Sequence, residues 1–205
     1  MSVRQRHWND IYRAKPDTQV SWFQETPSRS LALIQEAEIP KSAPILDVGG
    51  GAARLVDTLM ARGFSDLSVL DVSDVALERS RTRLCEQAAQ ISWINADITE
   101  WNPPRRWMIW HDRAMFHFLV TESAQQDYVS ALTRATLPGA TVIIAGFAPE
   151  GPERCSGLNV QRHSAAGLAR LLGGNFRFIS KSEEIHRTPA GVGQDFLYVC
   201  FKRLS

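Results

Sequence analysis

The sequence contains few cysteines, almost no net charge and no long apolar segment. Its three cysteines, Cys85, Cys155 and Cys200, are odd in number and widely spaced, which disfavours a disulfide framework or a zinc site. A formal net charge of +1 disfavours nucleic acids and membranes as partners, because both are usually bound through an excess of basic residues. No run of about 18 apolar residues is present, and residues 1–8 lack the apolar core of a signal peptide. We therefore expect a cytoplasmic protein that holds no metal.

Apolar segments alternate along the 205 residues in the order typical of a single α/β domain. We expect two N-terminal helices near residues 5–15 and 26–38. Strands are then expected near 44–48, 67–72, 91–95, 107–111 and 140–147, and helices near 52–62, 74–89, 122–136 and 164–172. Pro138-Gly139 should end the third of these helices, and residues 149–158 should be irregular. Buried strands alternating with helices predict a doubly wound, mostly parallel sheet, closed by an antiparallel hairpin of strands near 176–186 and 194–203.

The most informative segment is Ile45–Leu55, which reads ILDVGGGAARL. An apolar strand runs into a glycine-rich turn and a helix pattern follows, so a ligand can lie against bare backbone beside free N–H groups. The spacing Asp-x-Gly-x-Gly-x-Ala differs from the Gly-x-Gly-x-x-Gly of dinucleotide-binding proteins. Asp47 suits a ligand with an ammonium group better than a phosphate. An ordinary strand–turn–helix of a nucleotide-binding fold is the alternative for this motif alone.

Two further strands end in an acidic residue. Asp71 follows the second strand, where a carboxylate can accept both ribose hydroxyls of a nucleoside. Asp97 follows the third strand. A single acid in such a place is more often a helix N-cap, a role also open to Asp74 and Thr99. Three acids at the carboxyl ends of successive strands, in register with a glycine turn, predict one ligand crevice.

With these motifs the chain resembles the class I, seven-strand S-adenosylmethionine-dependent methyltransferases, and especially the small thiopurine-methyltransferase-like group. The resemblance covers the cofactor motifs and one segment of the fourth strand. It implies a seven-stranded Rossmann-like sheet whose last strand is antiparallel, with S-adenosylmethionine as cofactor and S-adenosylhomocysteine as product. It also implies contacts from Asp47 to the ammonium group and from Asp97 to the adenine amino group. The cofactor-binding residues expected from this resemblance are Trp8, Tyr12, Trp22, Asp47, Gly49, Gly50, Gly51, Asp71, Val72, Asp97, Ile98 and His111.

The fourth strand ends in Trp110-His111-Asp112-Arg113, which resembles a Tyr/Trp-Asp-Arg segment of thiopurine methyltransferases. There the arginine contacts cofactor or substrate, which implies the same of Arg113. A local Asp112–Arg113 ion pair that only shapes the turn is the alternative. His111 and His117 are candidate catalytic bases beside Arg113, although a single histidine is more often a structural residue. The Asn/Asp-Pro-Pro-Tyr segment of amino-group methyltransferases is missing, so base flipping is not expected.

Residues 1–40 are interpreted as a helical lid over a Rossmann-like core of residues 41–205. Aromatic rings in the lid can attract a sulfonium by cation–π interaction, or they can simply hold the helix to the sheet. The loop 151–163 and the hairpin 188–196 should border the acceptor, because long irregular loops in compact domains usually carry function. The substrate-binding residues expected are Phe23, Arg113, Phe116, Cys155, Arg162 and Gln194. Cys155 is either a reactive thiol or a passive small residue.

These observations predict a methyltransferase that passes a methyl group to a small-molecule acceptor and exists as a monomer or weak homodimer. In-line attack on a sulfonium methyl needs alignment and desolvation more than acid–base help. A protein-lysine methyltransferase and a non-catalytic S-adenosylmethionine-binding regulator are the alternatives. A nicotinamide oxidoreductase is disfavoured by Asp47.

Overall fold

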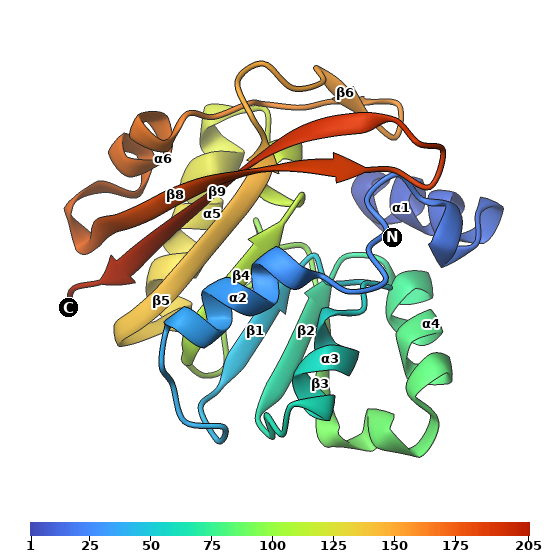
Figure 1. Ribbon diagram of the computed structural model, residues 1–205, viewed down its shortest axis with the longest axis horizontal. Coiled ribbons are helices and arrows are strands. Elements are labelled where there is room, and N and C mark those ends of the chain that lie inside the picture. The colour runs from blue at the N-terminus through green and yellow to red at the C-terminus, as the bar shows by residue number, and fades with distance from the viewer.

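The computed structural model describes residues 1–205 and contains a twisted seven-stranded sheet with helices on both faces (Figure 1). The strand order is β3-β2-β1-β4-β5-β9-β8. Neighbours from β3 to β5 are parallel, and the last strand, β9, is antiparallel to both β5 and β8. The strands are β1 (Ile45–Val48), β2 (Leu67–Asp71), β3 (Ile91–Asn95), β4 (Trp107–Arg113), β5 (Thr136–Phe147), β8 (Phe176–Arg187) and β9 (Gly193–Arg203). The doubly wound sheet predicted from the sequence is confirmed.

Six helices accompany the sheet: α1 (Val3–Ala14), α2 (Ser28–Glu36), α3 (Leu55–Ala61), α4 (Asp74–Leu84), α5 (Glu122–Ala135) and α6 (Ala165–Leu172). Apolar side chains of α2, α3 and α4 pack against one face of the sheet, and those of α5 and α6 against the other. Strands buried on both faces explain the nearly continuous apolar runs of β1 and β2. No helix is both long and apolar enough to span a lipid bilayer.

Hydroxyl side chains begin four of the helices. Ser2, Ser73, Thr121 and Ser164 each accept a hydrogen bond from the backbone N–H three residues further on. Ser73 therefore caps α4, and Asp74, an expected cap, is instead the first residue of that helix.

Three local features differ from the sequence prediction. Helix α3 begins at Leu55 rather than near residue 52, because the intervening residues belong to the turn. Strand β5 begins at Thr136 and includes Pro138-Gly139, which were expected to end a helix and form a turn. Gly139 has a φ of +77°, and the β4–β5 register shifts beside Trp107, so the glycine is accommodated in an irregular stretch of ladder.

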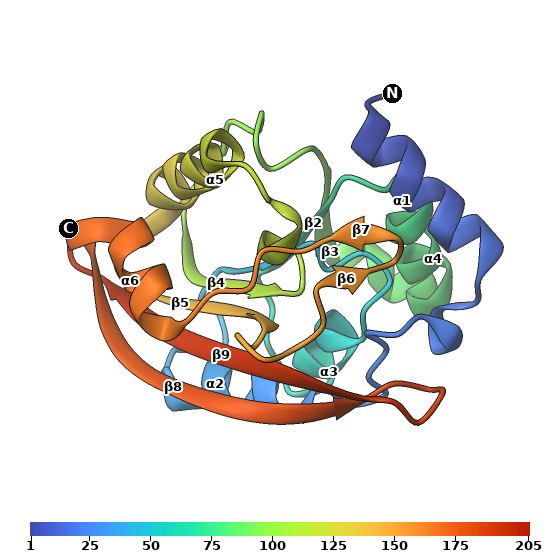
Figure 2. The ribbon, with the colours of Figure 1, turned by 90° about the horizontal axis from the view of Figure 1, so that it is seen from above.

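The third difference is a small second sheet between β5 and α6. Residues Arg154–Cys155 (β6) pair with Leu158–Asn159 (β7) in a segment expected to be irregular. Figure 2 shows this hairpin over the carboxyl-terminal edge of the main sheet, near α1. Together with α1, it encloses the edge at which the parallel strands end.

Candidate functional site

A pocket of about 860 Å³, counting its open mouth, lies at the carboxyl ends of β1, β2, β3 and β4. Ligands of open α/β sheets bind at this edge. Sequence-predicted residues in its lining are Trp8, Tyr12, Trp22, Gly49, Asp71, Val72, Asp97, Ile98, Arg113 and Cys155. We call it the main pocket. It joins residues from the N-terminal helix, four strand ends and the β6–β7 hairpin.

Asp71 is the buried acid of the main pocket and has no cationic partner among the ion pairs of the chain. One of its oxygens accepts a hydrogen bond from the Ser73 N–H at 2.8 Å. Burial and, to a smaller extent, the charge of Asp47 together raise the pKa of Asp71 from 3.8 to about 7, against the effect of backbone donors. A buried carboxylate of this kind needs hydroxyl or cationic donors from a ligand, and two ribose hydroxyls supply such donors.

Asp97 also lines the main pocket and is already paired. Arg4 of α1 donates from Nη1 to both Asp97 oxygens, at 3.0 and 3.1 Å, and to the Thr99 hydroxyl at 3.0 Å. Asp97 Oδ1 also accepts from the backbone N–H and the hydroxyl of Thr99. The expected acidic residue is thus in place, and it also holds α1 over the pocket.

The glycine turn packs too closely for side chains. A Cβ on Gly49 would lie 2.5 Å from the Cβ of Met115, and one on Gly50 would lie 2.5 Å from Oδ2 of Asp47. Gly51 has a φ of +38°, and a Cβ there would lie 2.7 Å from an Asp71 oxygen. Gly49 lines the main pocket, whereas Gly51 acts on it through Asp71.

Aromatic rings from the N-terminal region cover the main pocket. The Trp8 ring centroid lies 5.8 Å from that of Trp22 and 4.8 Å from that of Phe118, and both pairs meet edge to face. Tyr12 lies 6.0 Å from Trp22 in the same manner. The burial of Tyr12 raises the pKa of its phenol above the ordinary value, and the nearby Asp71 raises it further.

A second pocket adjoins the main one, and Trp22 and Arg113 line both pockets. Its lining includes the sequence-predicted residues Phe23, Asp47, Gly50 and His111. In register, Asp47 of β1 lies beside His111 of β4. His111 Nδ1 is 2.7 Å from Asp47 Oδ1, and its Nε2 is 2.8 Å from the Ser30 hydroxyl of α2. Both nitrogens of the buried His111 are therefore used by protein groups.

Arg113 connects the two pockets with one donor left free. Its Nε donates to the Tyr198 hydroxyl at 2.9 Å, and one terminal nitrogen donates to the Trp22 carbonyl at 3.1 Å. Its guanidinium carbon lies 4.4 Å from the ring centroid of Phe196. The other terminal nitrogen, Nη2, is buried without a partner. A buried N–H without a partner is costly, so this nitrogen suits an acceptor atom brought by a ligand.

Asp112 does not pair with Arg113, which excludes the local ion pair considered above. Asp112 instead accepts hydrogen bonds from the Tyr128 hydroxyl and from the N–H groups of Met115 and Phe116. Burial raises its pKa to about 6 although these hydrogen bonds oppose the shift. Asp112 therefore shapes the turn after β4, where Ala114 has a left-handed φ of +69°.

His117 lies outside both pockets and is poorly suited to act as a base. Burial, with smaller contributions from the charges of Arg113 and His163, lowers the pKa of its imidazole from 6.5 to about 3. Its Nδ1 accepts a long hydrogen bond of 3.4 Å from the Phe147 N–H. A neutral imidazole with this pKa is a weak proton acceptor near pH 7.

Three expected substrate-binding residues lie apart from the two pockets. Phe116 is buried in the core around α5. Arg162 pairs with Glu153 at 2.9 Å, and Gln194 lies in β9 opposite His186. Cys155 does line the main pocket, but burial raises the pKa of its thiol above the ordinary value, which favours the unreactive form.

Several known proteins are similar to this chain in sequence or structure. Residues 45–139 match the model of a family described as a methyltransferase domain. The chain superposes with a TM-score of 0.75 on a structure from work on the conversion of a disulfide bond into a thioacetal group during echinomycin biosynthesis. That pair shares 20% identity and covers 98% of this chain and 93% of the other. The chain has the class I methyltransferase fold.

Two further proteins that are similar to this chain have names that point to different methyl acceptors. One structure is a 1,6-didemethyltoxoflavin-N1-methyltransferase of Burkholderia thailandensis with bound 1,6-didemethyltoxoflavin and S-adenosylhomocysteine; its TM-score is 0.71 at 16% identity, covering 98% of this chain and 84% of that one. The EEF1A lysine methyltransferase 2 of Mus musculus is 28% identical over 106 residues. This match spans 48% of the present chain and 43% of the mouse protein.

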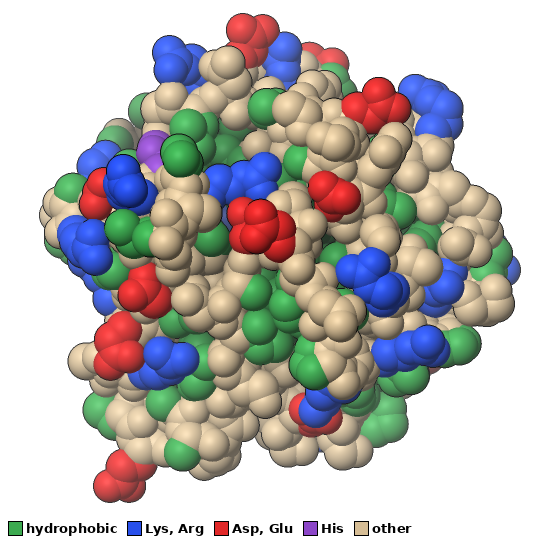
Figure 3. Space-filling view, turned by 180° about the vertical axis from the view of Figure 1, so that it is seen from behind, with side chains coloured by type: hydrophobic (Ala, Val, Ile, Leu, Met, Phe, Trp, Pro, Cys, Tyr) green, Lys and Arg blue, Asp and Glu red, His purple; other side chains and the backbone are tan.

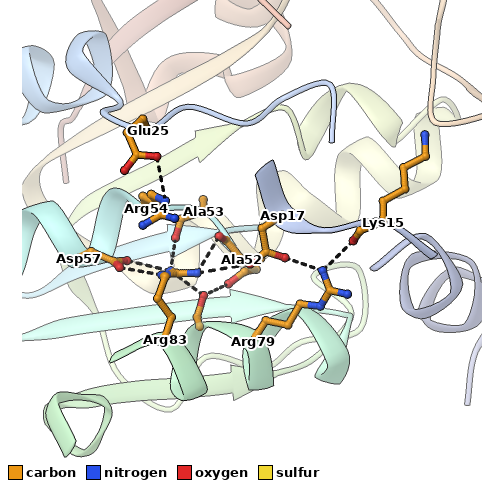
Figure 4. A network of polar contacts seen from close by, with 11 residues as sticks. Lys15, Asp17, Glu25, Ala52, Ala53, Arg54, Asp57, Arg79 and Arg83 are labelled. Carbon is orange, nitrogen blue, oxygen red and sulfur yellow. Dashed lines mark hydrogen bonds and ion pairs between the residues drawn. The ribbon is translucent and has the colours of Figure 1, made fainter. Parts of the chain in front are cut away.

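In this class I methyltransferase fold, an arginine network attaches the N-terminal segment to the glycine turn (Figure 4). Arg83 of α4 donates to the carbonyls of Ala52 and Ala53 and to both oxygens of Asp57. Arg79 donates to Asp17 Oδ1 and to the Lys15 carbonyl. Since Arg83 also lies 3.7 Å from Asp17, the turn and the segment that follows α1 share one ionic cluster.

Several pocket residues were missed by sequence reasoning. Arg4, Met115, Phe118 and Leu158 line the main pocket, and Tyr198 positions Arg113. Met115 and Phe118 follow the predicted β4 motif closely enough to have been included. Arg4 and Tyr198 have no local motif, because each acts on residues more than 80 positions away.

Proposed function

We propose that this chain is an S-adenosylmethionine-dependent methyltransferase acting on a small, neutral or anionic acceptor. The observation that carries the proposal is the buried, cation-free Asp71 between the glycine turn and the aromatic rings of the main pocket. Its carboxylate accepts the ribose hydroxyls of the donor, while Asp97 and Ile98 border the adenine. The methionine end of the donor lies toward Gly49 and Asp47.

Residues 1–40 form the lid of the donor site in this proposal. Arg4, Trp8, Tyr12 and Trp22 all reach the main pocket from the N-terminal region. The faces of aromatic rings attract positive charge, and the sulfonium of the donor brings one to this pocket. Ordered packing of these rings also excludes water from the reacting methyl group.

The acceptor enters beside Arg113, Phe118 and Cys155 in this proposal. The free Nη2 of Arg113 suits a carbonyl, thiolate or carboxylate of the acceptor, and its charge disfavours an ammonium group nearby. Positively and negatively charged side chains are mixed over the face shown in Figure 3, in line with a small acceptor rather than a polyanion. The toxoflavin-type relative, which holds a small heterocycle, gives the same indication.

In this proposal most of the rate enhancement comes from aligning the acceptor with the methyl group and removing water from both. Both nitrogens of His111 are engaged, and the low pKa of His117 leaves it a weak base. An acceptor that is already nucleophilic near neutral pH needs no base. Arg113 then orients the acceptor while its own proton stays in place.

A protein-lysine acceptor is the second candidate, since the mouse relative is named as a lysine methyltransferase. A lysine amine must lose a proton from a group with a pKa of about 10.4 before it attacks. Asp112 is the acid nearest the end of β4, and its oxygens are occupied by Tyr128 and the backbone. Because the oxygens of Asp112 are already occupied, Asp112 is poorly placed to receive a lysine proton, and this favours the small-molecule acceptor.

The test has two steps. Mass spectrometry of the purified protein and calorimetry with S-adenosylhomocysteine first establish donor binding. Release of S-adenosylhomocysteine is then followed with small thiols, metalloids and anionic heterocycles, and in parallel with lysine-containing protein acceptors. Turnover of a small acceptor supports the proposal. Donor binding without turnover of any acceptor would instead indicate a regulator, and transfer to protein lysine alone would establish the second candidate.

A further inference from the structure

The sheet ends in a long strand whose outer edge is unpaired. Strand β8 spans Phe176–Arg187 and has β9 as its only neighbour, so it forms the border of the sheet in Figures 1 and 2. Outside the β8–β9 ladder, residues 177–187 make no backbone–backbone hydrogen bond. Such an edge can add another strand unless the chain protects it.

One face of β8 is covered by the protein itself. Arg29 of α2 donates to the Ser182 hydroxyl, and Gln24 donates to Glu184. His186 bonds the Ser21 carbonyl on the same side. Because side chains alternate along a strand, Lys181, Glu183 and Ile185 lie on the other face, where all three are exposed. The unpaired edge therefore has one supported face and one open face.

The charged side chains on the open face allow two copies of β8 to pair opposite charges. In an antiparallel pair of two β8 strands centred on Ser182, Lys181 of one copy lies opposite Glu183 of the other, and this contact occurs twice. In the same register Ile185, 68% exposed, lies across from the irregular step of the other copy, which contains Ile179, 49% exposed. A parallel pair in register would instead place Lys181 against Lys181, which is unfavourable. Arg177 and Arg187 face each other only at the two ends, beyond the irregular step between Phe178 and Ser180.

We propose that two copies of this chain associate through β8, antiparallel and centred on Ser182, to give a continuous sheet of fourteen strands. This gives twice the seven strands of one copy. No residue of β8 lines the main pocket or the second pocket, so each copy keeps its own site. The association is an isologous two-fold interface, in which both copies use the same surface.

Charge exchange tests this interface. Analytical ultracentrifugation over a range of concentrations measures the dimer dissociation constant of the wild-type chain, of Lys181→Glu, of Glu183→Lys and of the double exchange. Each single exchange places two pairs of like charges at the interface and should weaken the dimer about tenfold or more. The double exchange restores opposite charges and should return the constant to near the wild-type value. Glu150→Lys, on an exposed loop, is the matched charge control.

A cysteine placed on the two-fold axis tests the register. In a Cys85→Ser background, which removes the exposed native thiol, Ser182→Cys should form a disulfide-linked dimer on mild oxidation. Ile185→Cys should not, because Ile185 lies away from the two-fold axis. A wild-type chain that stays monomeric at the highest concentration would overturn the proposal. So would a double exchange no better than the single ones, or equal cross-linking at both cysteine positions. Affinity for S-adenosylhomocysteine should be unchanged in every variant, which separates this interface from donor binding.

Discussion

Gly51 approaches Asp71 so closely that a Cβ on the glycine would lie 2.7 Å from the carboxylate oxygen Oδ2. Gly51→Ala should therefore displace the carboxylate and weaken S-adenosylhomocysteine binding at least about tenfold, because charge-assisted hydrogen bonds depend on position. Gly63→Ala is the matched control, since Gly63 also has a positive φ, +83°, but open space around it. Both variants should lose about 1–2 kcal/mol of stability from left-handed strain. Calorimetry and thermal melting separate the two effects, and equal affinity in both variants would contradict this role of the turn.

Asp71→Ala should lower S-adenosylhomocysteine affinity at least about tenfold while the fold survives. The variant loses two hydrogen bonds to a charged group, each worth roughly 1.5–3 kcal/mol. Asp127→Asn, an exposed carboxylate on α5, should bind as the wild-type chain does. Calorimetry that finds unchanged affinity in Asp71→Ala would remove the main support for the donor site.

Donor affinity should depend on pH through Asp71. With a folded-state pKa of about 7, the carboxylate is mostly ionised at pH 8, whereas at pH 6 a proton must leave before both ribose hydroxyls can donate. Calorimetry should find affinity about tenfold weaker at pH 6 than at pH 8, and Asp71→Asn should flatten the profile. The stability of the ligand-free protein has the opposite trend: the folded-state pKa is raised above 3.8, so this contribution is full at lower pH and is lost as the pH rises toward 7.

Trp8→Leu should distinguish the charged donor from its neutral product. If the rings of Trp8, Trp22 and Phe118 attract the sulfonium, S-adenosylmethionine binding should weaken several-fold more than S-adenosylhomocysteine binding, for a cation–π contribution of about 0.5–2 kcal/mol. Trp93→Leu is the control, because Trp93 on β3 is also half-buried and its ring packs against Arg81. This variant measures the effect of losing an indole outside the main pocket. Equal losses for both ligands would mean that Trp8 only packs the lid.

Arg113→Lys should impair the acceptor more than the donor. Lysine keeps the charge but loses the planar fork that reaches Tyr198, the Trp22 carbonyl and the free position together. We expect kcat/KM for an anionic acceptor to fall about tenfold or more, with little change in S-adenosylhomocysteine affinity. Arg203→Lys, another arginine stacked on a phenylalanine, is the control. A selective loss of donor affinity would assign Arg113 to the methionine carboxylate instead.

The strands and their terminal acids were predictable because each depends on local sequence. Buried parallel strands read as apolar runs, and Asp47 and Asp71 mark where two of them end. The start of β5 was not predictable in this way, because Pro-Gly usually ends an element. Here the ladder with Trp107 of β4 outweighs that local preference.

The parts of the site that sequence reasoning missed depend on distant pairs. Arg4 and Asp97 are 93 positions apart, and Arg113 and Tyr198 are 85 apart. Arg162 and Gln194 were expected in the acceptor pocket from their loops alone, yet each side chain lies elsewhere once the hairpins fold. The chemistry open to His111 and His117 could not be predicted from position either, because burial and neighbouring hydroxyl or carboxylate groups determine what an imidazole can do.

A buried carboxylate without a cationic partner in the main pocket links the lifetime of this protein to the supply of its ligand. Above pH 7 the ligand-free fold carries the desolvation cost of Asp71, and any molecule that donates to that carboxylate removes part of it. A ligand present at 100 times its dissociation constant adds about 2.7 kcal/mol of stability. Because proteolysis acts on the transiently unfolded fraction, cells short of this ligand would degrade the protein sooner.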